Sequence, residues 1–263
     1  RSYFATQGSP HLMKARMDSG QVAVGMIVRL TRSVEIAAIA HSAGFDCLYI
    51  DLEHCTFSLE SVSQICMMAT ALGVTPMVRV AGLDPAEISR TLEAGAQGII
   101  IPHLDTAEDA RRAVQAAKFP PLGQRSLLAM NPHTLFRGGP AAEVMAKMNG
   151  ATLVVGMIES ETAVTNADAI AAVEGMDMLL VGSNDLCNSF GIPGQLDHPR
   201  LMEAYETVLA ACRRHGKHLG VGGLNSRPEI ARRIIGMGAR YVSAGSDTGF
   251  LMAAASATAQ SFR

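Results

Sequence analysis

Short apolar runs recur along the chain and alternate with amphipathic segments. Most runs are apolar on both faces and rich in branched aliphatic residues, which is typical of strands covered on both sides. They lie at residues 22–29, 46–51, 76–80, 98–102, 152–158, 177–182, 218–222 and 241–245. The pattern therefore predicts eight buried strands.

Helix signals fill the gaps between these runs. Residues 33–43 and 58–72 carry apolar positions at helical spacing, and a glycine follows each segment. Asp84-Pro85 places a capping side chain before a proline at the first helical position, and Gly95 ends that helix. A helix after every strand predicts parallel strands joined by right-handed crossovers.

Eight strand–helix units favour one α/β domain over residues 1–263, folded as a (β/α)8 TIM barrel. The chain length also fits, because such a barrel needs roughly 250 residues. A doubly wound open sheet is the alternative, and it would place a G-x-G-x-x-G turn after the first strand. Residues 29–32 read RLTR instead. The barrel is therefore the better prediction.

One connection is unusually long. The segment FPPLGQRSLLAMNPHTLFRGGP separates the helix that ends near Ala117 from the strand at 152–158. Long loops in compact domains usually carry a function. We predict that this segment crosses the mouth of the barrel and continues into a short helix from Ala141 to Met148.

Charge and composition narrow the class of protein. The net charge is −2 and the basic residues are scattered, which argues against nucleic acid as a partner. No apolar stretch approaches the roughly 20 residues of a membrane span, and the early Pro10, His11 and Lys14 interrupt any signal-peptide core. The five cysteines form no C-x-x-C pair. Buried thiols in the cytoplasm are expected.

Polar residues follow the strands directly. Catalytic groups of (β/α)8 barrels lie at the carboxyl ends of the strands, so these positions are the candidates for chemistry. They are Asp51, Glu53, His54, Arg79, His103, Glu159, the segment 182–185, Gly222, Gly223, Ser246 and Asp247.

Two carboxylates follow neighbouring strands. Glu159 comes directly after LVVGMI, where a charge is costly to bury without a partner, and Asp185 follows the next strand, about 4.8 Å away. We predict that Glu159 and Asp185 bind one divalent cation, with Mg²⁺, Mn²⁺ or Co²⁺ suiting oxygen ligands best. The alternative is that these carboxylates pair with arginines or cap helices.

Further basic and acidic side chains follow the second and third predicted strands, near this predicted metal site. Arg79 interrupts an apolar strand and must face an anion in the lumen or form an internal salt bridge. Asp51, Glu53 and His54 form a compact set in which a carboxylate could orient the imidazole as a general base. The alternative for His54 is a hydrogen bond to a carbonyl.

The chain resembles a known family in an ordered set of segments. They are AGFDCLYIDLEH (43–54), TPMVRV (75–80), EAGAQGIIIPHLDTAEDA (93–110), FPPLGQR (119–125), MIES (157–160), GSNDLCNSFGIPGQ (182–195) and GARYVSAGSD (238–247). These are similar to the HpcH/HpaI class II aldolases, metal-dependent pyruvate aldolases related to the citrate lyase β-subunit superfamily.

The resemblance implies roles for individual residues. Glu159 and Asp185 match the metal ligands, His54 the base, and Arg79 the residue that steadies the enolate oxygen. Asn184 matches the position whose backbone holds the substrate carboxylate. Glu93 stands where the family usually has an aspartate that assists the base from a neighbouring subunit, which implies a homo-oligomer, a trimer or a hexamer.

Departures from the family pattern concern substrate choice. Met157 replaces a glutamine that touches the 2-oxo acid in many members, and Ser183 lies in GSNDL where G-P-x-D-L is commoner. The sequence QRSLL also replaces the usual R-G after Arg125. We expect Met157, Ser183, Asn184 and Asp185 to line a pocket that tolerates bulkier or less polar partners.

The predicted activity is reversible cleavage of a 4-hydroxy-2-oxo acid to pyruvate, or a related 2-oxo acid, and an aldehyde through a metal-stabilised enolate. An oxaloacetate decarboxylase and a malyl- or citramalyl-CoA lyase are the alternatives. A lysine Schiff base is not expected, since Lys14, Lys118, Lys147 and Lys217 lie outside the strand cores.

Overall fold

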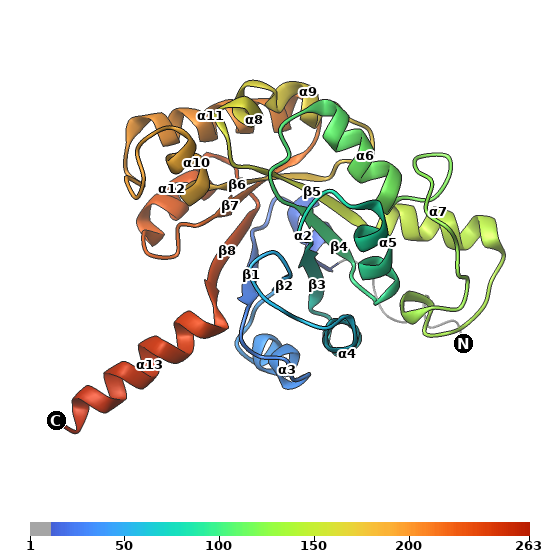
Figure 1. The fold of residues 1–263 in the computed structure, drawn as a ribbon, viewed down its shortest axis with the longest axis horizontal. Helices are drawn as coiled ribbons and strands as arrows, with labels where there is room; N and C mark the ends of the chain where they lie inside the picture. Colours follow the sequence, from blue (N-terminus) through green and yellow to red (C-terminus); the bar gives the residue numbers. More distant parts are fainter. Residues whose placement is uncertain (1–11) are drawn as a thin grey trace.

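The computed structural model describes residues 12–263 as a closed barrel of eight parallel strands, ordered β1 to β8 (Figure 1). The TIM-barrel prediction is confirmed. The strands are β1 (Ala23–Val28), β2 (Cys47–Asp51), β3 (Thr75–Arg79), β4 (Gly98–Ile101), β5 (Leu153–Ile158), β6 (Met178–Gly182), β7 (His218–Gly222) and β8 (Tyr241–Ser246). Pro10 and His11 lie outside the described residues, so the single domain over 1–263 stays a prediction.

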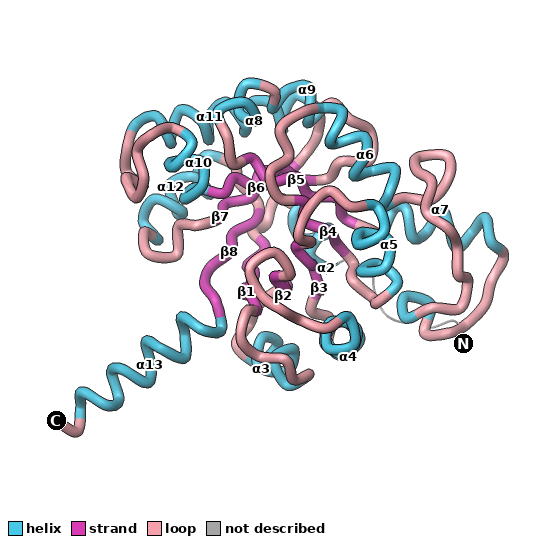
Figure 2. The backbone as a smooth tube through the Cα atoms, viewed as in Figure 1, coloured by secondary structure: helices cyan, strands magenta, loops and turns pink. Residues whose placement is uncertain are grey.

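Helices connect the strands on the outside of the barrel (Figure 2). Asp84 caps its helix as predicted, because its side chain accepts from the N–H group of Ala86, and Ser58 caps the preceding helix by accepting from the N–H group of Ser61. The helices are α2 (Leu12–Asp18), α3 (Glu35–Ser42), α4 (Leu59–Ala71), α5 (Pro85–Glu93), α6 (Ala107–Ala117), η1 (Pro132–Thr134), α7 (Ala141–Ala151), α8 (Glu161–Thr165), α9 (Ala167–Ala171), α10 (Ser183–Ser189), α11 (Pro199–Arg214), α12 (Pro228–Met237) and α13 (Asp247–Ser261).

Alternation along the strands divides the core into two layers. One layer packs strands against helices, and the other fills the lumen with residues such as Ile27, Tyr49, Met77, Met157 and Leu180. Above this apolar filling, buried polar residues occupy the carboxyl ends of the strands. The polar residues therefore form one surface, at the end of the barrel where the carboxyl ends of the strands lie.

The long connection after α6 does not cross that end. It starts at the carboxyl end of a helix and returns to the start of β5, and both points lie on the opposite face of a (β/α)8 barrel. Its contacts agree, since His133 Nε2 lies 2.8 Å from the carbonyl oxygen of Leu92 and Arg125 Nη2 lies 2.7 Å from Glu93 Oε1. The prediction of a loop over the mouth is wrong for this chain, whereas the helix from Ala141 is present.

The last helix leaves the barrel. α13 projects from the end of β8 into solvent instead of packing back over its own strand (Figures 1 and 2). Its side chains Phe250, Leu251 and Met252 are exposed, as is Ala244 on β8. No helix within residues 12–263, this one included, is long and apolar enough to cross a membrane. The expected ring of eight covering helices therefore lacks its last member.

Candidate active site

A buried ion pair forms the base of the site. Arg79 donates from Nε to Asp51 Oδ1 at 3.0 Å and from Nη2 to Asp51 Oδ2 at 2.7 Å, and Arg29 Nε reaches the same Oδ2 at 2.8 Å. Burial alone would raise the pKa of Asp51, but the hydrogen bonds and charge of Arg79, with Arg29, hold it below its usual value. Asp51 therefore stays ionised and fixes the guanidinium of Arg79.

Asp51 also anchors the turn that carries the imidazole. Its Oδ1 accepts from the backbone N–H groups of Glu53 at 3.2 Å and His54 at 3.3 Å, so it contacts the backbone of His54 and not its ring. The carboxylate beside the ring is that of Glu53, with Oε2 3.8 Å from His54 Nε2. The carboxylate nearest the His54 ring is therefore that of Glu53, whereas Asp51 positions Arg79.

Glu53 itself is incompletely satisfied. Its Oε2 lies 2.6 Å from Arg79 Nη1, but the angle does not make a hydrogen bond, and this buried oxygen has no donor among the described residues. The His54 side chain is 55% exposed. An exposed imidazole thus lies beside a partly buried carboxylate, an arrangement that suits proton transfer.

His103 is a site residue that sequence reasoning noted only as the end of a strand. Its backbone N–H donates to Glu159 Oε2 at 3.0 Å, and its ring lies between Glu53 Oε1, 3.0 Å from Nε2, and Glu159 Oε2, 3.3 Å from Nδ1. The backbone is left-handed, with a φ of +50°. That conformation aims both the amide and the ring at one carboxylate, and no sequence pattern signals it.

Glu159 has the electrostatics of a cation ligand. It is 4% exposed at the end of β5. Burial raises its pKa; the amide and ring of His103 oppose this, while the carboxylates of Asp185 and Glu53 raise the pKa further. A cation at this point would neutralise that accumulated negative charge, so the donor set fits a divalent ion.

Asp185 is the second predicted ligand and does not cap its helix. It is exposed in the first turn of α10. The N-cap residue of this helix is Gly182, which has no side chain to cap it. The capping alternative is therefore wrong. Residues 12–263 hold no cluster of three or more His, Cys, Asp or Glu side chains with ligand spacing. A cation here would take its remaining oxygens from water or substrate.

Two glycines make room for these groups. A Cβ atom on Gly182 would lie 2.5 Å from Glu159 Oε1, and one on Gly223 would lie 2.9 Å from Asn184 Nδ2. Gly223 also has a φ of +75°, which favours glycine. Both positions are therefore closed to larger residues for reasons of the site and not of the core.

The predicted pocket residues have different surroundings. Met157 is 5% exposed in the lumen, with its Sδ 3.6 Å from Tyr49 Oη and 3.9 Å from Arg79 Nη1. Asn184 is exposed near the mouth, and its Nδ2 donates to the carbonyl oxygen of Gly223 at 3.4 Å. The Ser183 hydroxyl is buried against Tyr205 Oη at 2.8 Å. Ser183 can therefore reach a ligand only through its backbone.

Two further groups lie away from this site. Glu93 ends α5 on the opposite face and pairs with Arg125, so the structure does not bring it to His54 of the same chain. Lys118 is buried and donates to the carbonyl oxygens of Asn149 and Thr152. Burial lowers the pKa of Lys118, but its place at the base of the barrel makes it structural.

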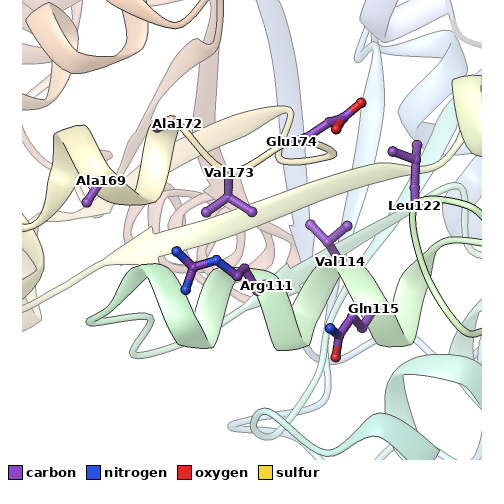
Figure 3. A pocket seen from close by; sticks show the side chains of 8 residues that line it. All are labelled: Arg111, Val114, Gln115, Leu122, Ala169, Ala172, Val173 and Glu174. Atoms are coloured by element: carbon purple, nitrogen blue, oxygen red, sulfur yellow. The ribbon is translucent and has the colours of Figure 1, made fainter.

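A separate hollow of about 330 Å³ lies in the outer helical layer, between α6 and α9 (Figure 3). Its lining includes Arg111, which already pairs with Glu108 at 2.9 Å. None of the predicted site residues lines it. The carboxyl ends of the strands remain the candidate active site.

Known proteins share this architecture. The family model described as HpcH/HpaI aldolase/citrate lyase matches residues 26–254. The chain is 40% identical over 246 residues to the 4-hydroxy-4-methyl-2-oxoglutarate aldolase of Hapsidospora irregularis, covering 92% of this chain and 90% of that protein. It is 34% identical over 236 residues to the 2-keto-3-deoxy-L-rhamnonate aldolase of Escherichia coli K12, covering 89% and 86%.

A solved structure agrees over nearly the whole chain. The HpcH/HpaI aldolase from Desulfitobacterium hafniense DCB-2 superposes with a TM-score of 0.87 at 30% sequence identity, covering 95% of each chain. The chain therefore belongs to the HpcH/HpaI aldolase/citrate lyase family.

Proposed function

We propose that this protein is a carbon–carbon lyase, a class II aldolase that reversibly cleaves a 4-hydroxy-2-oxo acid to pyruvate, or a related 2-oxo acid, and a carbonyl compound. The observation that carries the proposal is the buried Glu159 carboxylate, which shares accumulated negative charge with Asp185 and Glu53. Arg79 stands close by, 2.6 Å from Glu53. The aldolase names of two relatives support the same reaction class.

A divalent cation would be held by Glu159 and Asp185. When bound, Mg²⁺, Mn²⁺ or Co²⁺ supplies a Lewis acid that polarises the carbonyl of the 2-oxo acid. The backbone N–H of His103 keeps Glu159 Oε2 in place for this task. Gly182 leaves the space that the Glu159 carboxylate needs.

The proton is handled by His54 in our proposal. In the cleavage direction the imidazole takes the proton of the 4-hydroxyl group, directly or through a water molecule, as the C3–C4 bond breaks. The Glu53 carboxylate, 3.8 Å from His54 Nε2, would stabilise the imidazolium that results. Arg79, fixed by Asp51, would stabilise the negative charge that develops on the C2 oxygen.

The partner carbonyl compound is less defined by the site. Met157 offers a thioether and no amide toward the lumen, which supports tolerance for bulkier or less polar partners. Asn184 and Asp185 are exposed near the mouth and would border the incoming substrate. The backbone of Asn184 is our candidate for holding the substrate carboxylate.

We further propose a homo-oligomer, a trimer or a hexamer, in the cytoplasm. Residues 248–261 of the projecting α13 contain no charged side chain, and Leu251 and Met252 are 58% and 61% exposed. Such a face needs cover, which a second copy would provide. In that assembly Glu93 would assist His54 of a neighbouring subunit.

The test is release of pyruvate from a panel of 4-hydroxy-2-oxo acids, with and without EDTA. We expect turnover that EDTA abolishes and Mn²⁺ restores. The variants Glu159→Gln and Asp185→Asn keep side-chain size and should lose turnover together with Mn²⁺ affinity. Metal-independent turnover would contradict the proposal, as would cleavage restricted to CoA esters or decarboxylation of oxaloacetate without aldol cleavage.

A further inference from the structure

Tyr49 is a buried phenol directly beneath the site. It stands two residues before Asp51 on β2, so both side chains face the lumen, and it is 3% exposed. Within residues 12–263 its hydroxyl has one polar neighbour in hydrogen-bonding reach, the thioether sulfur of Met157 at 3.6 Å. Buried phenol hydroxyls normally find a strong acceptor, and a thioether is a weak one.

A second donor is aimed at the same sulfur. Nε and Nη2 of Arg79 are occupied by Asp51, whereas Nη1 lies 2.6 Å from Glu53 Oε2 without a hydrogen bond to it and donates to Met157 Sδ at 3.9 Å. The guanidinium carbon lies 5.4 Å from the centre of the Tyr49 ring. A phenol hydroxyl and a charged N–H thus converge on one weak acceptor in a buried space. An oxygen atom at that point would satisfy both donors better.

The sulfur can yield its place. Methionine is unbranched and has three rotatable side-chain bonds, so it adapts to a new neighbour at low cost. Tyr49 cannot move in the same way, because its ring packs in the luminal core with Ile27 and Met77. The donors are therefore fixed and the acceptor is replaceable.

We propose that Tyr49 is a catalytic residue whose hydroxyl, together with Arg79 Nη1, binds the C2 oxygen of the 2-oxo acid. Without substrate, Met157 Sδ occupies the position that this oxygen takes. The proposal rests on the proposed function and extends it. The hydroxyl keeps its proton throughout and donates a hydrogen bond, so no bond forms or breaks at Tyr49. Burial raises the pKa of Tyr49 far above its usual range, which keeps the donor protonated.

The main variant is Tyr49→Phe, which removes one oxygen atom from the full-length, metal-loaded enzyme. Loss of one donor to a developing oxyanion costs roughly 10²-fold or more in turnover. We expect kcat to fall by about this factor with little change in KM. Oxalate, a planar dianion that resembles the enolate of pyruvate, should bind at least 10-fold more weakly in the presence of Mn²⁺, while the Kd for Mn²⁺ alone stays unchanged.

A matched control separates this role from a structural one. Tyr241→Phe removes the hydroxyl of another fully buried luminal tyrosine, which contacts Ser243 Oγ at 3.0 Å, and should keep kcat and the oxalate Kd. If Tyr241→Phe reproduced the loss of kcat and of oxalate affinity seen in Tyr49→Phe, the effect would be a general one of removing a luminal hydroxyl, and that outcome would overturn the proposal.

An oxalate Kd and a kcat that both stay within twofold in Tyr49→Phe would also overturn the proposal. Failure of the proposed function is recognised separately, because the unmodified enzyme would then release no 2-oxo acid with any metal. The oxalate titration remains readable in that case. A loss of oxalate affinity confined to Tyr49→Phe would support the two-donor site.

Discussion

The backbone N–H of His103 donates a 3.0 Å hydrogen bond to Glu159 while His103 adopts a left-handed conformation, with a φ of +50°. This conformation is costly for most residues and tolerated best by glycine and asparagine. We therefore predict that His103→Asn keeps its stability, whereas His103→Val loses about 1–2 kcal/mol. Denaturant unfolding measures this difference. Equal stability of the two variants would show that the conformation is unstrained.

Gly182→Ala tests the space reserved for the Glu159 carboxylate. The added Cβ would lie 2.5 Å from Oε1, so the carboxylate must move. We predict a loss of Mn²⁺ affinity of at least roughly 10-fold, or about 1.4 kcal/mol, measured by titration calorimetry. Gly236→Ala is the matched control, because its Cβ meets nothing within 4 Å. Unchanged Mn²⁺ binding in Gly182→Ala would contradict the assignment of Glu159.

Arg79→Lys tests the forked contact with Asp51. Lysine cannot make the two parallel hydrogen bonds, so the buried carboxylate keeps Arg29 but loses its bidentate partner. We predict a stability loss of about 2–4 kcal/mol and a fall in kcat/KM of about 10²-fold or more. Thermal unfolding and pyruvate release measure the two effects. Wild-type turnover in this variant would remove Arg79 from the mechanism.

Asp247 makes stability depend on pH. Burial would raise its pKa, but backbone N–H groups of Arg29, Thr31, Leu30 and Thr248 donate to it and hold the pKa below its usual value. This stabilisation is present above the unfolded pKa near 3.9 and is lost as the pH falls through the lower folded pKa. We predict that Asp247→Asn lowers the Tm at pH 7. The difference from wild type should shrink below about pH 3.9, and a constant difference would contradict the assignment.

The apolar face of α13 predicts association. Leu251→Glu places a charge on that face and should shift the protein to smaller species in size-exclusion chromatography with light scattering. Gln260→Glu adds the same charge near the end of the helix and serves as the control.

Co-expressed His54→Ala and Glu93→Ala chains should regain part of the lost activity if one site uses residues of two subunits. No recovery in mixed oligomers would argue against Glu93.

Much of the fold could be predicted from the sequence because the strand signal is local. Apolar runs bounded by turn residues identified all eight strands within a residue or two. The strand-end rule then selected Asp51, Arg79, Glu159 and Asp185, which is a consequence of barrel topology and not of their neighbours in sequence. That part of the site follows from the alternation of strand and helix.

The remainder depends on contacts between distant segments. The pairing of Asp51 with Arg29, and of Glu53 with His103, joins strands that no local pattern connects. No sequence pattern predicts the left-handed backbone conformation of His103 either. The long connection was placed at the wrong end because its length suggested a function, although a helix-to-strand loop always starts on the face opposite the mouth. The contact of the Tyr49 hydroxyl with Met157 likewise joins two strands that are distant in the sequence.

Arg29 connects the start of α13 with the candidate active site. Its backbone N–H donates to Asp247 at the root of α13, and its side chain reaches the Asp51 carboxylate that fixes Arg79. Tilting the protruding helix would therefore shift the arginine that shares the Asp51 carboxylate with Arg79. In the proposed oligomer, specific activity is accordingly expected to decline on dilution, because separation of the subunits would release the helix.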